Sequence, residues 1–258
     1  MKAMIFAAGL GTRLKPLTDT MPKALVPVCG KPLLYHVLTK LIAGGYDDIV
    51  VNVHHFPDQI IQYLEAHDFG VRVRVSDERD FLRETGGGIR YARPMLSDFS
   101  APLEKTGPGQ PFLVHNVDIV SNLDLGWLRA QHPEGALATL VVSERNTRRY
   151  FLFDDNGRLK GWTNLSTGEV RSPYKDLDPA KCRRLAFSGI HLISPDIFDA
   201  FDALGFGERF SIVDFYLKAC ADYPVYAAVP PDFTMVDVGK KETLSEAERV
   251  CRTILPLR

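Results

Sequence analysis

Short apolar runs alternate with segments of helical periodicity through the first half of the chain. The apolar runs are typical of buried strands and comprise Ala3–Ala8, Ile49–Val53, Val71–Val75 and Phe112–Val114. The segments between them place apolar residues on one helical face and comprise Leu33–Ala43, Gln59–Ala66 and Gly88–Leu96. This β–α alternation predicts a mainly parallel sheet that is covered by helices on both faces.

The second half of the chain is less regular. The expected strands are Ala138–Val142, Tyr150–Phe153, Leu159–Trp162, Leu185–Ile193 and Val225–Val229, and the expected helices are Ile212–Ala221 and Glu242–Ile254. The sequence DDNG at residues 154–157 separates two of these strands and predicts a β-hairpin. Because no repeat or linker divides the chain, we expect one domain over residues 1–258.

Composition narrows the function classes. The 258 residues are 45% hydrophobic and 24% charged, which is ordinary for a folded soluble protein. A formal net charge of -1 gives no general attraction to nucleic acid or acidic membranes, so any anion site must be local. The four cysteines are scattered without a C-x-x-C pair, which indicates a reducing cytoplasm rather than a zinc site or a disulfide framework. No apolar stretch is long enough to span a membrane.

One stretch, FAAGLGTRLKPLTDTMPKALVPV between Phe6 and Val28, places glycines and cations directly after the first expected strand. Glycines give up backbone entropy and cations resist burial, so Gly9, Gly11 and their basic neighbours indicate an anion site. In open α/β sheets ligands bind beyond the carboxyl ends of the strands, where backbone N–H groups can reach phosphates. A Walker A loop is absent, and Leu14 occupies the third small position of a dinucleotide fingerprint, which disfavours an NAD enzyme.

The segment AAGLGTRLKPLTDTMPKALVPV resembles the signature of the sugar-1-phosphate nucleotidyltransferases, also called nucleotide-sugar pyrophosphorylases. Further segments resemble the same family in the same order: ETGGGI at 84–89, LVHNVDIV at 113–120, FSGIHLIS at 187–194 and MVDVGKKETL at 235–244. The resemblance implies a three-layer α/β/α Rossmann-like nucleotidyltransferase fold with a mainly parallel mixed sheet. It also implies an enzyme that converts a nucleoside triphosphate and a sugar 1-phosphate into an NDP-sugar and pyrophosphate.

The resemblance also implies the roles of individual residues. Arg13, Lys23 and Asp118 are expected to be catalytic, and Asp118 and Asp237 are expected to bind Mg²⁺ as the cofactor. The residues expected to bind substrate are Gly9, Gly11, Thr12, Glu84, Gly86, Gly87, Asn116, Gly189 and Asp214. A sugar phosphate, with a second pKa of about 6, is already anionic near neutral pH, so this chemistry needs charge neutralisation rather than a general base.

The sugar and the base are less closely specified. Among short members of the family, ETGGG most resembles the N-acetylmuramate-1-phosphate uridylyltransferases of cell-wall recycling, which favours N-acetylmuramate 1-phosphate and UTP. Mannose-, heptose- and glucose-1-phosphate nucleotidyltransferases that use GTP or dTTP stay open. The Glu-Lys-Pro that often holds the sugar in the family is missing. Gly161–Glu169 lies in that region, where Trp162, Asn164 and Glu169 are either substitutes or parts of a surface hairpin.

Other function classes also stay open. One is a non-catalytic nucleotide-sugar-binding module on the same fold. Another is a metal-dependent glycosyltransferase, which would usually show D-x-D, whereas Asp118 is followed by Ile119-Val120. For the enzyme, residues 1–120 are expected to form a nucleotide-binding half and residues 121–258 a sugar-binding half. We expect a monomer or homodimer whose partners are the two substrates, with no nucleic acid and no membrane.

Overall fold

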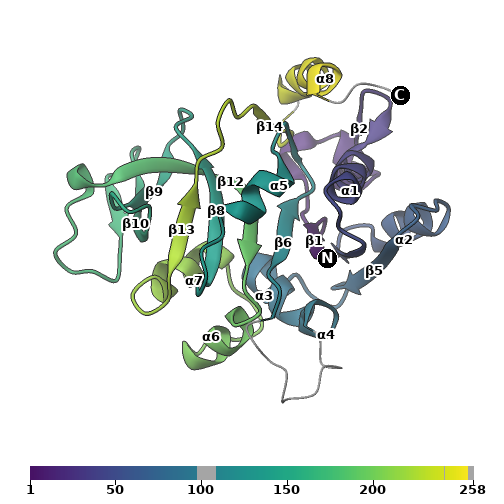
Figure 1. The fold of residues 1–258 in the computed structure, drawn as a ribbon. Helices are drawn as coiled ribbons and strands as arrows, with labels where there is room; N and C mark the ends of the chain where they lie inside the picture. Colours follow the sequence, from purple (N-terminus) through teal and green to yellow (C-terminus); the bar gives the residue numbers. More distant parts are fainter. Residues whose placement is uncertain (98–108, 241, 255–258) are drawn as a thin grey trace. The chain divides into compact units, whose positions relative to one another are not determined.

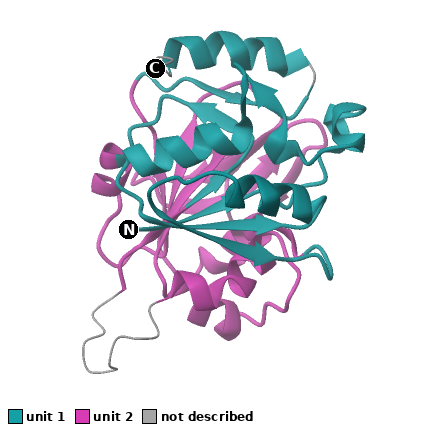
Figure 2. Cartoon of the chain, turned by 90° about the vertical axis from the view of Figure 1, so that its right-hand side faces the viewer, with its two compact units in different colours: residues 1–82, 114–125, 232–258 teal, residues 83–113, 126–231 magenta. Residues whose placement is uncertain are grey.

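The computed structural model describes residues 1–97, 109–240 and 242–254, which form two compact units. The first unit comprises residues 1–82, 114–125 and 232–258, and the second comprises residues 83–113 and 126–231 (Figure 2). Both units are discontinuous in sequence. The assignment of a nucleotide-binding half to residues 1–120 and a sugar-binding half to residues 121–258 stays a prediction.

Parallel strands form the centre of the first unit (Figure 1). β1 (Lys2–Phe6) pairs with β4 (Asp48–Val53), which pairs in turn with β5 (Arg72–Asp77). The interior of β1 and most of β4 are buried because their side chains are apolar on both faces of the sheet. Two helices pack nearby, α1 (Leu33–Ala43) and α2 (Pro57–Glu65). The parallel arrangement brings the carboxyl ends of the three strands to one edge.

Short elements complete the first unit. β6 (Phe112–Asn116) leads into β7 (Ile119–Ser121), which pairs antiparallel with β14 (Met235–Asp237). The remaining elements are the 3₁₀ turns Thr12–Leu14, Leu17–Asp19 and Lys23–Leu25, the hairpin of β2 (Pro27–Val28) with β3 (Lys31–Pro32), and α8 (Glu242–Ile254). The pairing of β7 with β14 joins segments that lie more than a hundred positions apart in the sequence.

The second unit is built on the long strand β12 (Arg183–Ile193), which pairs antiparallel with β8 (Ala138–Ser143) and with β9 (Arg149–Phe153). β13 (Val225–Ala228) runs parallel to β8. β10 (Leu159–Asn164) pairs antiparallel with β9 and with β11 (Glu169–Arg171). The helices are α3 (Glu84–Tyr91), α4 (Arg93–Leu96), α6 (Ile197–Ala203) and α7 (Ile212–Ala219), and α5 (Leu125–Ala130) enters from the first unit. A 3₁₀ turn spans Pro179–Lys181.

Most of the expected elements are confirmed. The helix at 33–43 agrees residue for residue, and DDNG joins β9 to β10 as an antiparallel hairpin. The expected helix at 88–96 is wrong in its bounds, because α3 begins at Glu84 and a second helix begins at Arg93. Glycine disfavours helix formation, but Gly86 and Gly87 are buried against residues 208–210, and this packing outweighs their low propensity. No helix among the described residues is long and apolar enough to cross a membrane.

Candidate active site

The loop after β1 depends on its two glycines in different ways. Gly11 has φ +64, and a Cβ at this position would lie 2.8 Å from Thr18 Cγ2 and 3.2 Å from Lys23 Cβ. Thr18 Oγ1 also donates a hydrogen bond of 2.8 Å to the Gly11 carbonyl, so the loop folds back on itself here. Gly9 is exposed, and a Cβ on it would meet nothing within 4 Å. Protein packing therefore requires a glycine at Gly11 but not at Gly9.

Lys23 contacts Asp118. Lys23 begins a 3₁₀ turn after Pro22, and its Nζ donates a hydrogen bond to Asp118 Oδ2. The side chains are 11% and 16% exposed, so the ion pair is largely shielded from water. Such shielding strengthens an ion pair relative to a surface pair. The structure thus brings together two residues that the sequence predicts to be catalytic.

Arg13 and Asp237 meet beside Gly239. A Cβ on Gly239 would lie 2.7 Å from Arg13 Nη2 and 2.6 Å from Asp237 Oδ1. Asp237 ends β14 opposite Ile119, and Val238 N donates a hydrogen bond of 2.8 Å to the Asp118 carbonyl. The two predicted metal carboxylates therefore occupy neighbouring positions of paired backbone. The sequence contains Gly239 in its VDVG segment, but only the fold reveals the space that it leaves.

The backbone around Asp118 is held by buried polar groups that the sequence reasoning missed. Lys40 of α1 donates hydrogen bonds to the carbonyls of Ser121 (3.0 Å) and Leu123 (2.7 Å), and burial lowers the pKa of Lys40 to about 8. His115 is fully buried, and this burial lowers its pKa to about 4. Its Nδ1 lies 2.8 Å from the Asn116 carbonyl. The sequence signal that could have revealed these contacts is Lys40, a lysine within the apolar helix 33–43.

Asp118 and Asp237 offer few protein ligands for a cation. In residues 1–97, 109–240 and 242–254, no group of three or more His, Cys, Asp and Glu side chains could hold a metal ion. Two carboxylates nevertheless fit the usual way in which Mg²⁺ is bound, by one or two carboxylates together with substrate phosphates. The donor set is therefore compatible with the predicted magnesium and does not resemble a zinc cage.

In the second unit, the predicted residues of the ETGGG segment form the start of α3. Glu84 has φ +60 and makes an ion pair of 3.2 Å with Arg209. A Cβ on Gly86 would lie 2.2 Å from Phe210 Cε2, and a Cβ on Gly87 would lie 2.2 Å from the Glu208 carbonyl oxygen. These two glycines allow a close approach of the protein's own chain. Their predicted contacts with substrate stay a prediction.

The other two predicted substrate residues of the second unit lie on different elements. Gly189 has φ +75 and lies in β12, where the pairing with β8 shifts register. Asp214 lies in the first turn of α7 and makes an ion pair of 2.8 Å with Arg171 of β11. In the Gly161–Glu169 segment, Asn164 Oδ1 accepts a hydrogen bond from Ser166 N and so stabilises the turn between β10 and β11. The segment is thus a hairpin, and its predicted contact with sugar stays a prediction.

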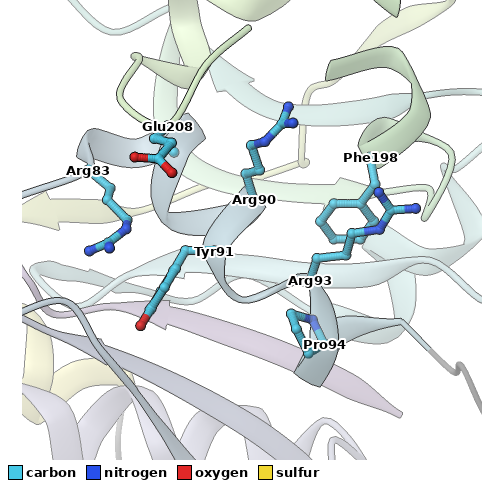
Figure 3. Close-up of a pocket in the computed structure, with 8 residues that line it drawn as sticks. Arg83, Arg90, Tyr91, Arg93, Pro94, Phe198 and Glu208 are labelled. Atoms are coloured by element: carbon cyan, nitrogen blue, oxygen red, sulfur yellow. The ribbon is translucent and has the colours of Figure 1, made fainter. Parts of the chain in front are cut away.

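A pocket of about 460 Å³ in the second unit is lined by Gly87 and three arginines (Figure 3). The Arg83 guanidinium lies 3.8 Å from the centroid of the Tyr91 ring. Arg90 donates hydrogen bonds to Asp202 (2.5 Å) and to the Phe206 carbonyl (2.9 Å), and Arg93 also contacts Asp202. Since Asp202 already pairs with Arg90 and Arg93, we assign no substrate to this pocket.

Known proteins resemble the chain over nearly its whole length. Residues 2–252 match the nucleotidyl transferase family. An N-acetylmuramate alpha-1-phosphate uridylyltransferase from Caulobacter vibrioides is 33% identical over 249 residues, covering 95% of each chain. Mannose-1-phosphate guanylyltransferase 1 from Arabidopsis thaliana is 28% identical over 247 residues, which are 93% of this chain and 62% of the relative.

The fold has relatives among solved structures. HddC from Yersinia pseudotuberculosis superposes with a TM-score of 0.73 at 22% identity, covering 96% of this chain and 98% of that chain. This likeness confirms the predicted Rossmann-like α/β fold. The match over residues 2–252 and the 33% identity to a full-length relative confirm the family that the glycine-rich signature predicts. The chain therefore belongs to the nucleotidyl transferase family of enzymes.

Proposed function

We propose that this chain transfers a nucleotidyl group from a nucleoside triphosphate to a sugar 1-phosphate and releases pyrophosphate. One observation carries the proposal. Each of the two predicted catalytic cations lies close to one of the two predicted metal carboxylates: Lys23 hydrogen-bonds Asp118, and Arg13 and Asp237 both border the space beside Gly239. Residues from three separate segments of the chain, the signature loop and the two that contain Asp118 and Asp237, therefore lie within the first unit. A binding surface for a neutral ligand would not need these charged side chains.

The reaction is a displacement at the α-phosphorus. An oxygen of the sugar 1-phosphate attacks, the new P–O bond forms, and the bond to the β-phosphate breaks to release pyrophosphate. The attacking group is anionic near neutral pH and needs no general base. Arg13 and Lys23 reduce the repulsion between the two polyanions and stabilise the charge on the transferring group. The exposed backbone at Gly9 leaves room for a phosphate beside its N–H group.

Asp118 and Asp237 would hold Mg²⁺, which supplies positive charge beside the phosphates when it is bound. Lys23 donates a hydrogen bond to Asp118, and Arg13 lies close to Asp237 beside Gly239. When substrates and cation arrive, the same two side chains can turn their positive charge toward phosphate oxygens.

We favour UTP and N-acetylmuramate 1-phosphate as the substrates. The Caulobacter vibrioides uridylyltransferase is 33% identical and is covered over 95% of its length, whereas the Arabidopsis thaliana guanylyltransferase is 28% identical and is covered over only 62% of its length. These substrates would place the enzyme in cell-wall metabolism in the cytoplasm. We also propose that it acts as a monomer or homodimer. Its four cysteines are free, which fits a reducing compartment. The alternatives are a mannose, heptose or glucose 1-phosphate with GTP or dTTP.

The test is pyrophosphate release in the presence of MgCl₂, with ATP, GTP, CTP, UTP and dTTP each combined with a panel of sugar 1-phosphates. The panel contains the N-acetylmuramate, mannose, heptose and glucose 1-phosphates. We expect release with UTP and N-acetylmuramate 1-phosphate. Release in another combination would correct the substrates but not the reaction. Binding of nucleotide sugars without any release of pyrophosphate would instead support a non-catalytic nucleotide-sugar-binding module.

A further inference from the structure

The backbone that leaves β1 is held by the side chain of Asn52. The Oδ1 atom of Asn52 accepts hydrogen bonds from Ala7 N (2.8 Å) and Ala8 N (3.3 Å), the last two residues before Gly9. Asn52 is 2% exposed and lies opposite Phe6 in the pairing of β4 with β1. The chain departs from the sheet at this point, so these two N–H groups need a partner other than a ladder carbonyl. The amide oxygen supplies that partner.

The other end of the Asn52 amide is held as well. Asn52 Nδ2 donates a hydrogen bond of 2.8 Å to Glu78 Oε1, and Glu78 is fully buried just after β5. The main chain of Glu78 is also fixed, because its N donates to the Val53 carbonyl (2.8 Å) and its carbonyl lies 2.8 Å from His54 Nδ1. Backbone N–H groups can only donate, so the amide oxygen must face Ala7 and Ala8. The orientation of the Asn52 amide is therefore determined by its partners.

We infer that the Asn52–Glu78 pair positions the glycine-rich loop for the triphosphate. The pair ties together the carboxyl ends of β1, β4 and β5, the edge where open α/β sheets bind their ligands. It fixes the backbone at Ala7 and Ala8, from which Gly9 and Arg13 follow. Asn52 and Glu78 are positioning residues and act only through this loop. The inference rests on the proposed function, since it takes the loop to be the triphosphate site.

The pair can be tested by exchanging its chemistry. Asn52→Asp keeps an acceptor for Ala7 and Ala8 but sets a carboxyl against Glu78, so the two carboxyl groups must share a proton or separate. In the double variant Asn52→Asp with Glu78→Gln, the glutamine amide donates to the aspartate, which restores a complementary pair. Asn52→Leu removes all three hydrogen bonds at similar volume. Ser76→Ala is the matched control. Ser76 is also buried and pairs with Asn52 across β4 and β5, but its hydroxyl makes no hydrogen bond with any residue that the structure describes.

The measurements are UTP affinity by calorimetry with MgCl₂, KM for UTP and for N-acetylmuramate 1-phosphate, and thermal unfolding. We expect Asn52→Asp and Asn52→Leu to weaken UTP binding and raise KM for UTP by about 10- to 100-fold, because small displacements of positioned groups have effects of that size. KM for the sugar phosphate should stay near the wild-type value, as should all readouts for Ser76→Ala. The double variant should recover most of the UTP affinity.

Amide hydrogen exchange at residues 6–14 reports the hydrogen bonds independently of turnover. Faster exchange in Asn52→Leu is expected. Faster exchange or a lower melting temperature with unchanged UTP affinity would overturn the inference and make the pair purely structural. Failure of the double variant to recover affinity, while it still melts like the wild type, would also overturn it. A wild-type chain that binds UTP but releases no pyrophosphate would instead refute the proposed reaction, and the binding measurements would still decide on the pair.

Discussion

Lys23 hydrogen-bonds Asp118 across 95 positions of sequence, which joins the signature loop after β1 to the end of β6. Their proximity cannot be read from neighbouring positions of the sequence. The fold brings them together because the signature loop and β6 lie at the same edge of the first unit, as the hydrogen bond from Val117 N to the Phe6 carbonyl shows (3.1 Å). A shielded ion pair of this kind is weak evidence for a stabilising role and stronger evidence for a functional one.

The first prediction concerns this pair. Asp118→Asn should lower the rate of pyrophosphate release by about 100-fold or more while the fold survives, because it removes charge at nearly constant shape. Lys23→Ala should also lower the rate strongly. Both are measured as initial rates with MgCl₂ and saturating substrates, next to thermal unfolding. Asp58→Asn, which removes an exposed partner of Arg79, is the control and should behave like the wild type. Wild-type rates in both site variants would refute the assignment of the active site.

The second prediction separates the two glycines of the loop. Gly9→Ala should leave the free energy of unfolding unchanged, since a Cβ there meets nothing within 4 Å, but it should raise KM for UTP. Gly11→Ala should destabilise the protein by about 1–2 kcal/mol or more, since φ is +64 and Thr18 Cγ2 lies 2.8 Å from the new Cβ. Denaturant titration and steady-state kinetics measure the two effects. An unchanged KM for UTP in Gly9→Ala would contradict the proposal that a phosphate binds beside Gly9.

The third prediction concerns the space at Gly239. Gly239→Ala should lower kcat/KM by about 10- to 100-fold, because its Cβ would displace Arg13 and Asp237 from their present positions. The backbone of Gly239 does not have the positive φ that disfavours alanine, so the effect is one of packing alone. Gly207→Ala is the matched control, since Gly207 has no atom within 4 Å of its Cβ position. Equal kcat/KM values for the two variants would contradict the role given to Gly239.

Much of the architecture could be predicted because the long elements carry their own periodicity. The helix at 33–43 ends at a glycine pair, and the DDNG turn lies between two apolar runs. The strands Ile119–Ser121 and Met235–Asp237 were missed, because three residues hold no period and their pairing partner lies more than a hundred positions away. Helix α6 was missed, although Phe198 and Phe201 face the core with helical spacing.

The candidate site likewise contains residues that the sequence could predict and residues that it could not. Arg13, Lys23, Asp118 and Asp237 could be predicted as site residues because the order of the family's motifs can be read along the chain, and their roles stay a prediction. Gly239 and Asn52 could not be assigned, because their importance arises from contacts that only folding creates. For Gly86 and Gly87, the predicted contact with substrate stays a prediction. The fold shows an additional reason for these glycines, because their missing side chains make room for Phe210 and Glu208.

The last prediction is that His115 lowers the free energy of unfolding of the protein at acidic pH. Complete burial holds the pKa of His115 at about 4, below the ordinary value of 6.5, so the folded chain keeps this ring neutral where the unfolded chain protonates it. The contribution of the neutral ring is complete above pH 6.5, falls as the pH drops from 6.5 to 4, and is lost below. The loss should reach roughly 3 kcal/mol at most, at about 1.4 kcal/mol per pKa unit.

Denaturant titrations at pH values from 7.5 to 4 measure this loss. His115→Gln removes the titrating ring, so its free energy of unfolding should decline less steeply over the same interval, whatever its value at pH 7.5. His67→Gln, at an exposed histidine, should keep the slope of the wild type. Because only the slope is compared, a general weakening of His115→Gln does not obscure the result. If the free energy of unfolding declined equally steeply with falling pH in all three proteins, a group other than His115 would cause the loss of stability in acid. The backbone next to Asp118 would then not depend on a neutral His115.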